Sequence, residues 1–193
     1  MALTFEAEGH IYKWDGTRVY SVTQILEDVG LSDYSMVPSN ILTDAQKRGT
    51  RVHLICELWD KGELDLDSLD GEDQDYLDQW IWFKKSKDIK TFDLIESPLY
   101  SERHKYAGTL DRLRGTTIYD IKTGPPAPGH PFQLAAYSFL LSEAYGLSTY
   151  KRIAVHLTRS TFKPKPYRVI KAKFDLNIFL SAKNVHHSKK GLL

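Results

Sequence analysis

The sequence has little cysteine: Cys56 is the only one among 193 residues. A single cysteine excludes an intrachain disulfide framework, and it excludes any four-cysteine zinc site or iron–sulfur cluster built from this chain alone. Cys56 lies among apolar residues at helical spacing, so we expect it to be a small buried side chain on a helix face.

Long hydrophobic runs are also missing. No stretch reaches about eighteen apolar residues, and the first twenty residues lack the basic start and apolar middle of a signal peptide. We therefore expect a cytoplasmic protein with no membrane partner. Internal repeats are absent as well, and 41% hydrophobic and 12% aromatic residues suffice for one core. We expect a single domain over residues 1–193, mainly helical over 1–90, with the sheet core and a basic C-terminal part over 91–193.

Net charge is small, at +1, but its distribution is uneven. Residues 57–78 hold ten acidic residues and one basic residue, whereas residues 151–193 hold eleven Lys or Arg and one acidic residue. A basic segment of this kind can follow a phosphate backbone, because neutralising phosphates releases condensed counterions. On charge alone, a solvated face balanced by the acidic stretch is an equal alternative.

The first half of the chain predicts one hairpin and three helices. Residues 5–20 have the pattern of a hairpin, and Ser21 offers a hydroxyl cap to a short helix that ends at Gly30. Apolar residues recur at helical spacing over 44–61, and Gly62 closes that run. Residues 72–85 begin with acids and end with lysines, as a helix dipole favours.

The second half changes to a period of two. Residues 91–100, 106–113 and 117–122 predict three strands of an antiparallel meander, with a turn at Gly115. A helix over 132–145, strands over 152–158 and 167–172, and a helix over 175–187 follow. A strand, helix and strand in this order form a right-handed crossover with a parallel pair. The predicted fold class is therefore α/β, with a central mixed β-sheet that contains an antiparallel meander and is flanked by helices.

The chemistry centres on the predicted hairpin around Gly115. Its register sets Asp111 opposite Tyr119 or Asp120, so the two carboxylates should be close. Opposed acids repel, and a protein that keeps them at a strand end usually places a cation there. Oxygen ligands of this kind suit Mg²⁺ or Mn²⁺. Side-chain alternation puts Lys122 on the same face as Asp120, where its ammonium could orient or deprotonate a water or stabilise charge on a phosphate.

His53 adds a third candidate ligand. It lies one helical turn before Glu57, so both side chains project from one face of the predicted helix. A lone histidine is more often structural, and an isolated Asp-x-Lys tripeptide is a weak signal. They indicate a metal site only because they occur together and in this order along the chain.

Taken together, these motifs resemble the PD-(D/E)XK nucleases, and more narrowly the RecB-like branch that includes phage and mitochondrial exonucleases. The resemblance spans most of the chain. It rests on His10-x-Tyr12 with Ser21-Val-Thr-Gln-Ile-Leu26, Gly49-Thr-Arg-Val-His53, Glu96-Ser-Pro-Leu, Gly108-Thr-Leu-Asp111, Asp120-Ile-Lys122-Thr-Gly124 and Gln133-Leu-Ala-Ala-Tyr137.

The resemblance implies a restriction-endonuclease-like core and a set of roles. Asp111 and Asp120 would bind Mg²⁺ or Mn²⁺ together with His53 and the carbonyl of Ile121. Lys122 would be the catalytic lysine. Gln133 and Tyr137, which are i and i+4 on one helix face, would form the helix motif that contacts the substrate.

The implied function is metal-dependent hydrolysis of phosphodiester bonds in DNA, favouring exonuclease action on single strands or duplex ends in recombination, repair or replication. The implied setting is a bacterial or phage-infected cell. One departure is that the family's second acid is often Glu, where this chain has Asp120. A non-catalytic DNA-binding module on the same fold is the rival. It would normally lack a ligand or the lysine, and this chain lacks neither. A hydrolase acting on another substrate through the same metal site is weaker, because no motif supports it.

Other residues have two interpretations. Glu57 and Glu96 are either outer metal ligands or charges on a helix face and a strand edge. The loop over 124–131 either shapes the substrate entrance or only connects two elements. Trp80 falls on an apolar face and is expected in the core, whereas Trp82 is undecided between core and base stacking. His186 and His187 are expected to lie at a frayed, solvated helix end rather than in a metal or phosphate site.

Overall fold

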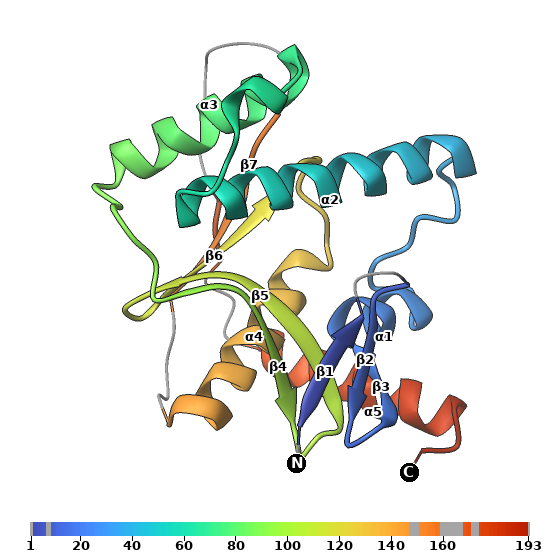
Figure 1. The fold of residues 1–193 in the computed structure, drawn as a ribbon. Coiled ribbons are helices and arrows are strands. Elements are labelled where there is room, and N and C mark those ends of the chain that lie inside the picture. Colours follow the sequence, from blue (N-terminus) through green and yellow to red (C-terminus); the bar gives the residue numbers. More distant parts are fainter. Residues whose placement is uncertain (1, 7–8, 147–150, 159–167, 171–173, 193) are drawn as a thin grey trace.

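The computed structural model describes residues 2–6, 9–146, 151–158, 168–170 and 174–192. Figure 1 shows the elements formed by these residues. They are β1 (Leu3–Glu6), β2 (Ile11–Trp14), β3 (Thr17–Ser21), α1 (Val22–Asp28), α2 (Ser39–Lys61), the 3-10 helix η1 (Leu66–Ser68), α3 (Gly71–Ser86), β4 (Leu94–Ser101), β5 (Tyr106–Arg114), β6 (Thr117–Lys122), α4 (His130–Tyr145), β7 (Lys151–His156), β8 (Arg168–Ile170) and α5 (Asp175–Lys189).

The described strands form one mixed sheet, as predicted. Its order is β1-β2-β3-β5-β6-β7-β8, with β4 paired to β5. Strands β4, β5 and β6 are the predicted antiparallel meander. The pair β6–β7, on either side of α4, is parallel, as the crossover argument required. The α/β class with a central mixed sheet flanked by helices is therefore confirmed.

One edge of β5 is shared by two strands. Strand β4 follows the other edge of β5 along almost its whole length. On the shared edge, β3 pairs with Tyr106 and Ala107, and β6 pairs with Arg112, Leu113 and Arg114. The residues between, 108–111, have no strand partner there among those described. The sheet is therefore split at the point where Asp111 lies.

Helices cover both faces of the sheet. Helices α1, α4 and α5 pack on one face through Leu110, Ile118 and Phe179, which are fully buried. Helices α2 and α3 pack on the other, chiefly over β6 and β7 (Figure 1). Cys56 and Trp80 belong to this second core at 0% exposure, so both core predictions are confirmed. Trp82 is 51% exposed and lies outside the core.

Helix boundaries differ from the predictions mainly at α2. This helix begins at Ser39, five residues before the predicted start, after Pro38 at its N-cap. Its first turns are largely exposed, so they have no apolar periodicity to signal a helix. Helix α1 begins as predicted, with Ser21 and Gln24 forming a capping box. The predicted strand over 167–172 lies partly outside the described residues, which include only 168–170 of it.

The prediction for His186 and His187 was wrong. They are 1% and 3% exposed, because α5 continues to Lys189 and packs against α1 and α4. Nδ1 of His186 lies 3.0 Å from Oδ2 of Asp28 on α1. Lys189 and Lys190 also pair with Asp28. These two lysines are therefore matched by a nearby acid and not by the acidic stretch over 57–78, and much of the basic segment lies outside the described residues.

No helix in the described part of the chain combines the length and the hydropathy needed to cross a membrane.

Candidate functional site

The candidate site lies at the split in the sheet, where β6 separates from β5. Past the Arg112–Tyr119 pair, the Asp111 carboxylate accepts a hydrogen bond from the backbone N–H of Ile121 at 2.6 Å. The side chain of Asp111 thus replaces the strand-to-strand hydrogen bonds that end there. It is 6% exposed, which places a carboxylate at the floor of the split.

His53 reaches this carboxylate from α2. Its Nε2 lies 3.0 Å from the carbonyl oxygen of Ile121, and its Nδ1 lies 3.3 Å from Oε1 of Glu96 and 3.7 Å from Oδ2 of Asp111. Burial alone lowers the pKa of His53, but the charges of Asp111 and Glu96 outweigh it and raise the pKa to about 9. The imidazole is therefore protonated at neutral pH, with an acceptor beside each ring nitrogen. The structure therefore brings His53, Asp111 and the carbonyl of Ile121 together.

Asp120 and Lys122 face the other side of β6, toward α4. Nζ of Lys122 lies 2.8 Å from Oδ2 of Asp120, although the geometry is that of an ion pair without a hydrogen bond. Asp120 is 1% exposed, and neither of its oxygens has a hydrogen-bond partner among the described residues. Burial, together with the charge of Asp111, raises the pKa of Asp120 to about 6. Burying a carboxylate is costly even when it is paired with one lysine, and an added cation would reduce that cost.

Helix α4 contacts the side chain of Lys122 through Gln133. Nζ of Lys122 donates to Oε1 of Gln133 at 2.9 Å, and Nε2 of Gln133 donates to the hydroxyl of Tyr137 at 3.0 Å. A Cβ added to Gly108 would meet Cε1 of Tyr137 at 2.6 Å, so only glycine lets this ring pack against β5. Gln133 and Tyr137 therefore form one hydrogen-bonded row with Lys122, and they share one helix face, as their i, i+4 spacing predicted. Both are largely buried, at 9% and 5% exposure.

These residues fit a divalent cation. One donor atom each from His53, Glu96 and Asp111 lies within 4.8 Å of the others. The carboxylate oxygens of Glu96 and Asp111 suit Mg²⁺ or Mn²⁺, and the imidazole of His53 is a further possible ligand for a divalent cation. Asp120 is outside this compact group, although the charge of Asp111 contributes to the raised pKa of Asp120.

Glu57 and Glu96, the two glutamates with alternative interpretations, have different surroundings in the structure. Glu96 lies in the cluster with His53 and Asp111. Glu57 points away to pair with Lys61 at 2.6 Å on an exposed helix face. Glu96 also has a backbone φ of +42°, which interrupts β4 opposite Asp111. A non-glycine residue held in this region indicates local strain, which is frequent at functional sites.

A buried arginine beneath the site was missed by sequence reasoning. Arg112 is 0% exposed and donates to Glu96 at 2.8 Å, to the carbonyl of Asp111 at 2.7 Å and to Asp60 at 2.7 Å. Asp60 also accepts from Trp80 and Lys84 on α3. This network ties α2 and α3 to the site. Its signal in the sequence was an arginine inside the central strand of the predicted meander, because a charge buried there needs partners.

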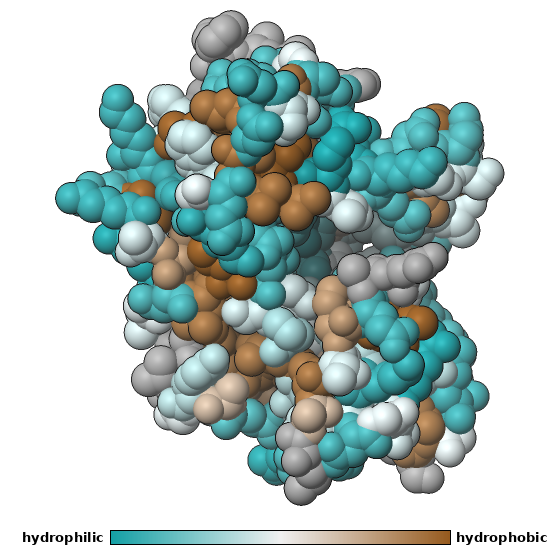
Figure 2. Space-filling view, in the orientation of Figure 1, coloured by the Kyte–Doolittle hydropathy of each residue, from teal (hydrophilic) through white to brown (hydrophobic). Residues whose placement is uncertain are grey.

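A groove of about 710 Å³ leads to the site. It is lined by α1, the first half of α2, the end of β6 and the loop that follows Lys122. Figure 2 shows the molecule hollowed beneath the projecting first half of α2. His53, Lys122 and Gln133 line its inner end, whereas Tyr34 and Ile41 line its outer part. Gly124 and Ala127 also line the groove, so the loop over 124–131 does more than connect two elements.

The fold has a solved counterpart. The crystal structure of a protein named "Putative exonuclease" from Eubacterium rectale matches 74% of this chain and 67% of its own, with a TM-score of 0.52 and 13% sequence identity. At this identity the likeness shows a shared fold. No protein-family model matches the sequence, and no curated protein does.

Proposed function

We propose that this protein is a divalent-metal-dependent DNA exonuclease of the PD-(D/E)XK superfamily, in its RecB-like branch. It would hydrolyse phosphodiester bonds during DNA recombination, repair or replication. The main observation in its favour is the buried Asp120 carboxylate, which forms an ion pair with Lys122 and whose pKa is raised by burial and by the charge of Asp111. The ordered sequence motifs and the shared fold with a protein named as an exonuclease add support.

The ion would be Mg²⁺ or Mn²⁺, held by His53, Asp111, Asp120 and the carbonyl of Ile121, with Glu96 beside them. A bound ion of this kind polarises a phosphoryl oxygen and lowers the pKa of a bound water. His53 would release its proton when the cation binds, because only the neutral imidazole is a ligand. The negative charge of Asp111 and Asp120 would then be balanced by the ion.

Lys122 would act as a fixed positive charge at the reacting phosphate. Burial lowers the pKa of Lys122, but Asp120 and Asp111 outweigh it and raise that pKa above its usual value. The ammonium therefore keeps its proton at neutral pH, which favours stabilising charge over removing a proton from water. Its contact with Gln133 fixes the direction of Nζ. Lys122 would thus hold the phosphate against the metal-binding carboxylates.

DNA would enter along the groove beneath α2. The basic C-terminal segment could contact the phosphate backbone outside it, since phosphate contacts supply affinity without sequence preference. The substrate would be a single strand or a duplex end. No iron–sulfur cluster takes part, because the chain has one cysteine.

The decisive experiment is digestion of end-labelled DNA. Linear and circular substrates, single- and double-stranded, would be incubated with Mn²⁺ and then with Mg²⁺. We expect metal-dependent degradation of linear DNA, no cleavage of circles, and loss of activity in Asp120→Asn. Cleavage of circles at the same rate would exclude an exonuclease.

The same experiment separates the rival function. A non-catalytic DNA-binding module would bind the substrates equally well with and without metal, form no product, and be unaffected by Asp120→Asn. That result would replace the nuclease proposal.

A further inference from the structure

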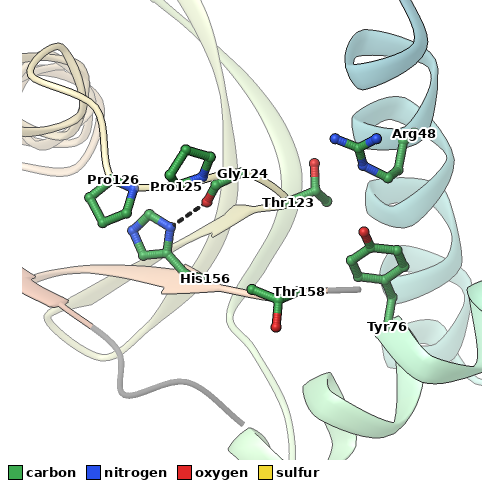
Figure 3. A pocket seen from close by; sticks show the side chains of 8 residues that line it. All are labelled: Arg48, Tyr76, Thr123, Gly124, Pro125, Pro126, His156 and Thr158. Carbon is green, nitrogen blue, oxygen red and sulfur yellow. Dashed lines mark hydrogen bonds between the residues drawn. The ribbon is translucent and has the colours of Figure 1, made fainter. Parts of the chain in front are cut away.

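A second, smaller pocket adjoins the groove. This side pocket, of about 330 Å³, lies between α2 and α3 on one side and the ends of β6 and β7 on the other (Figure 3). Its lining includes Arg48, Tyr76 and Thr123 at one end and Pro125, Pro126 and His156 at the other. The nuclease site uses none of these side chains.

One end of the side pocket is polar. Figure 3 shows the guanidinium of Arg48 and the hydroxyl of Tyr76 pointing toward Thr123. Nε of Arg48 is buried and has no hydrogen-bond partner among the described residues. Arg51, three residues further along α2, instead pairs with Asp73 at 2.5 Å. A guanidinium fork matches phosphate oxygens, so this end suits a phosphate group.

The other end presents the imidazole of His156 and the rings of two prolines. Nδ1 of His156 donates to the carbonyl of Gly124 at 2.9 Å, which fixes the imidazole beside Pro125 and Pro126. The imidazole offers a π-face on which any base can stack, and the two prolines add apolar surface beside it. The side pocket therefore combines a phosphate end with a base end.

The side pocket is continuous with the groove. Arg48, Thr123, Gly124 and Pro125 line both. Thr123 follows Lys122 directly in the chain. A strand whose reacting phosphate lies at Lys122 would therefore pass its neighbouring nucleotide across Thr123.

We propose that the side pocket binds one unpaired nucleotide of the strand being cut, next to the scissile phosphate. Its phosphate would contact Arg48, and its base would lie against Pro125, Pro126 and His156. The volume is at the lower end of the range for ligand pockets, so it suits one nucleotide better than a base pair. The strand would have to be unpaired at this position. The role of the side pocket in DNA cleavage rests on the proposed nuclease function. The binding test below does not depend on that function.

The test measures binding of a free nucleotide in the absence of metal. Deoxyadenosine 5′-monophosphate would be titrated into the purified protein in EDTA and followed by calorimetry, with inorganic phosphate as a second probe. Arg48→Met removes the phosphate contact, and Thr158→Phe fills the pocket. Thr158 tolerates the change because its contacts with Gln79 use its backbone N–H and carbonyl. Lys47→Met is the matched control, since it removes one exposed charge from the same helix.

We expect the nucleotide to bind more tightly than phosphate, and its affinity to fall about tenfold or more in Arg48→Met and in Thr158→Phe but not in Lys47→Met. Circular dichroism would confirm that the variants are folded. Absent binding, equal affinity for phosphate, or equal loss in the control would overturn the proposal. Nucleotide binding by a protein that cleaves no DNA would leave the side pocket standing and reject the nuclease function. Cleavage without nucleotide binding would do the reverse.

Discussion

The imidazole Nδ1 of His53 lies 3.3 Å from the carboxylate of Glu96, on a strand 43 positions away in the sequence. Glu96 adopts a positive φ there and receives a hydrogen bond from the buried Arg112. A strained acid, held by a buried arginine and directed at a histidine, is suited to orient the proposed metal ligands.

Glu96→Gln should therefore weaken Mn²⁺ binding by about tenfold to a hundredfold, the range found for residues that orient metal ligands. Calorimetric titration with Mn²⁺ gives the affinity. Glu57→Gln is the matched control, because Glu57 pairs with Lys61 away from the cluster. An equal effect of the two substitutions would show that Glu96 has no special role.

Arg112→Met should destabilise the fold by about 3–5 kcal/mol, because it leaves the carboxylate of Asp60 buried with fewer partners and frees Glu96. Urea denaturation in EDTA measures the free energy of unfolding. Arg114→Met, on the same strand but with an exposed contact to the carbonyl of Asp88, should cost less than about 1 kcal/mol. Similar costs for the two variants would contradict the proposed importance of the buried network.

Gly108→Ala should cost about 1–3 kcal/mol, since its Cβ would lie 2.6 Å from the ring of Tyr137. The displaced ring would also disturb Gln133 and, through it, Lys122. Thermal denaturation and the DNA digestion rate should fall together. Gly71→Ala, where a Cβ meets nothing within 4 Å, should leave both unchanged or raise stability slightly. An unperturbed Gly108→Ala would mean that Tyr137 moves freely.

Stability should depend on pH through His187. Burial, with the charges of Lys183 and His186, lowers the pKa of His187 to about 4 from 6.5. The folded protein therefore resists protonation, and the stability that the neutral imidazole contributes is complete above pH 6.5 and is lost as pH falls toward 4. Thermal denaturation of wild type and His187→Gln across this window would check the prediction. Each kcal/mol lost lowers the Tm by about 2–4 °C in a chain of this size. Parallel pH curves for the two proteins would refute it.

The part of the site that the sequence predicted depends on local geometry. A short turn at Gly115 sets the β5–β6 register, alternation places Asp120 and Lys122 together, and helical spacing aligns Gln133 with Tyr137. Each of these relations follows from a fixed backbone period, so single residues sufficed to predict them.

The part that was missed depends on long-range packing. The Arg112–Asp60 pair arises only when α2 packs on the sheet, and the positive φ of Glu96 has no signal in the sequence. The burial of His186 and His187 likewise requires α5 to dock on α1. No local period in the sequence reports such contacts.

The most direct test of the proposed active site is the rate of Mn²⁺-dependent nucleotide release from linear single-stranded DNA by Lys122→Met. We expect a loss of about a hundredfold or more, with Mn²⁺ still bound, because the variant lacks the ammonium that stabilises charge at the phosphate. Lys151→Met, at the opposite end of the β6–β7 pair, should keep the wild-type rate. A Lys122→Met protein that releases nucleotides as fast as wild type would contradict the assignment of the active site.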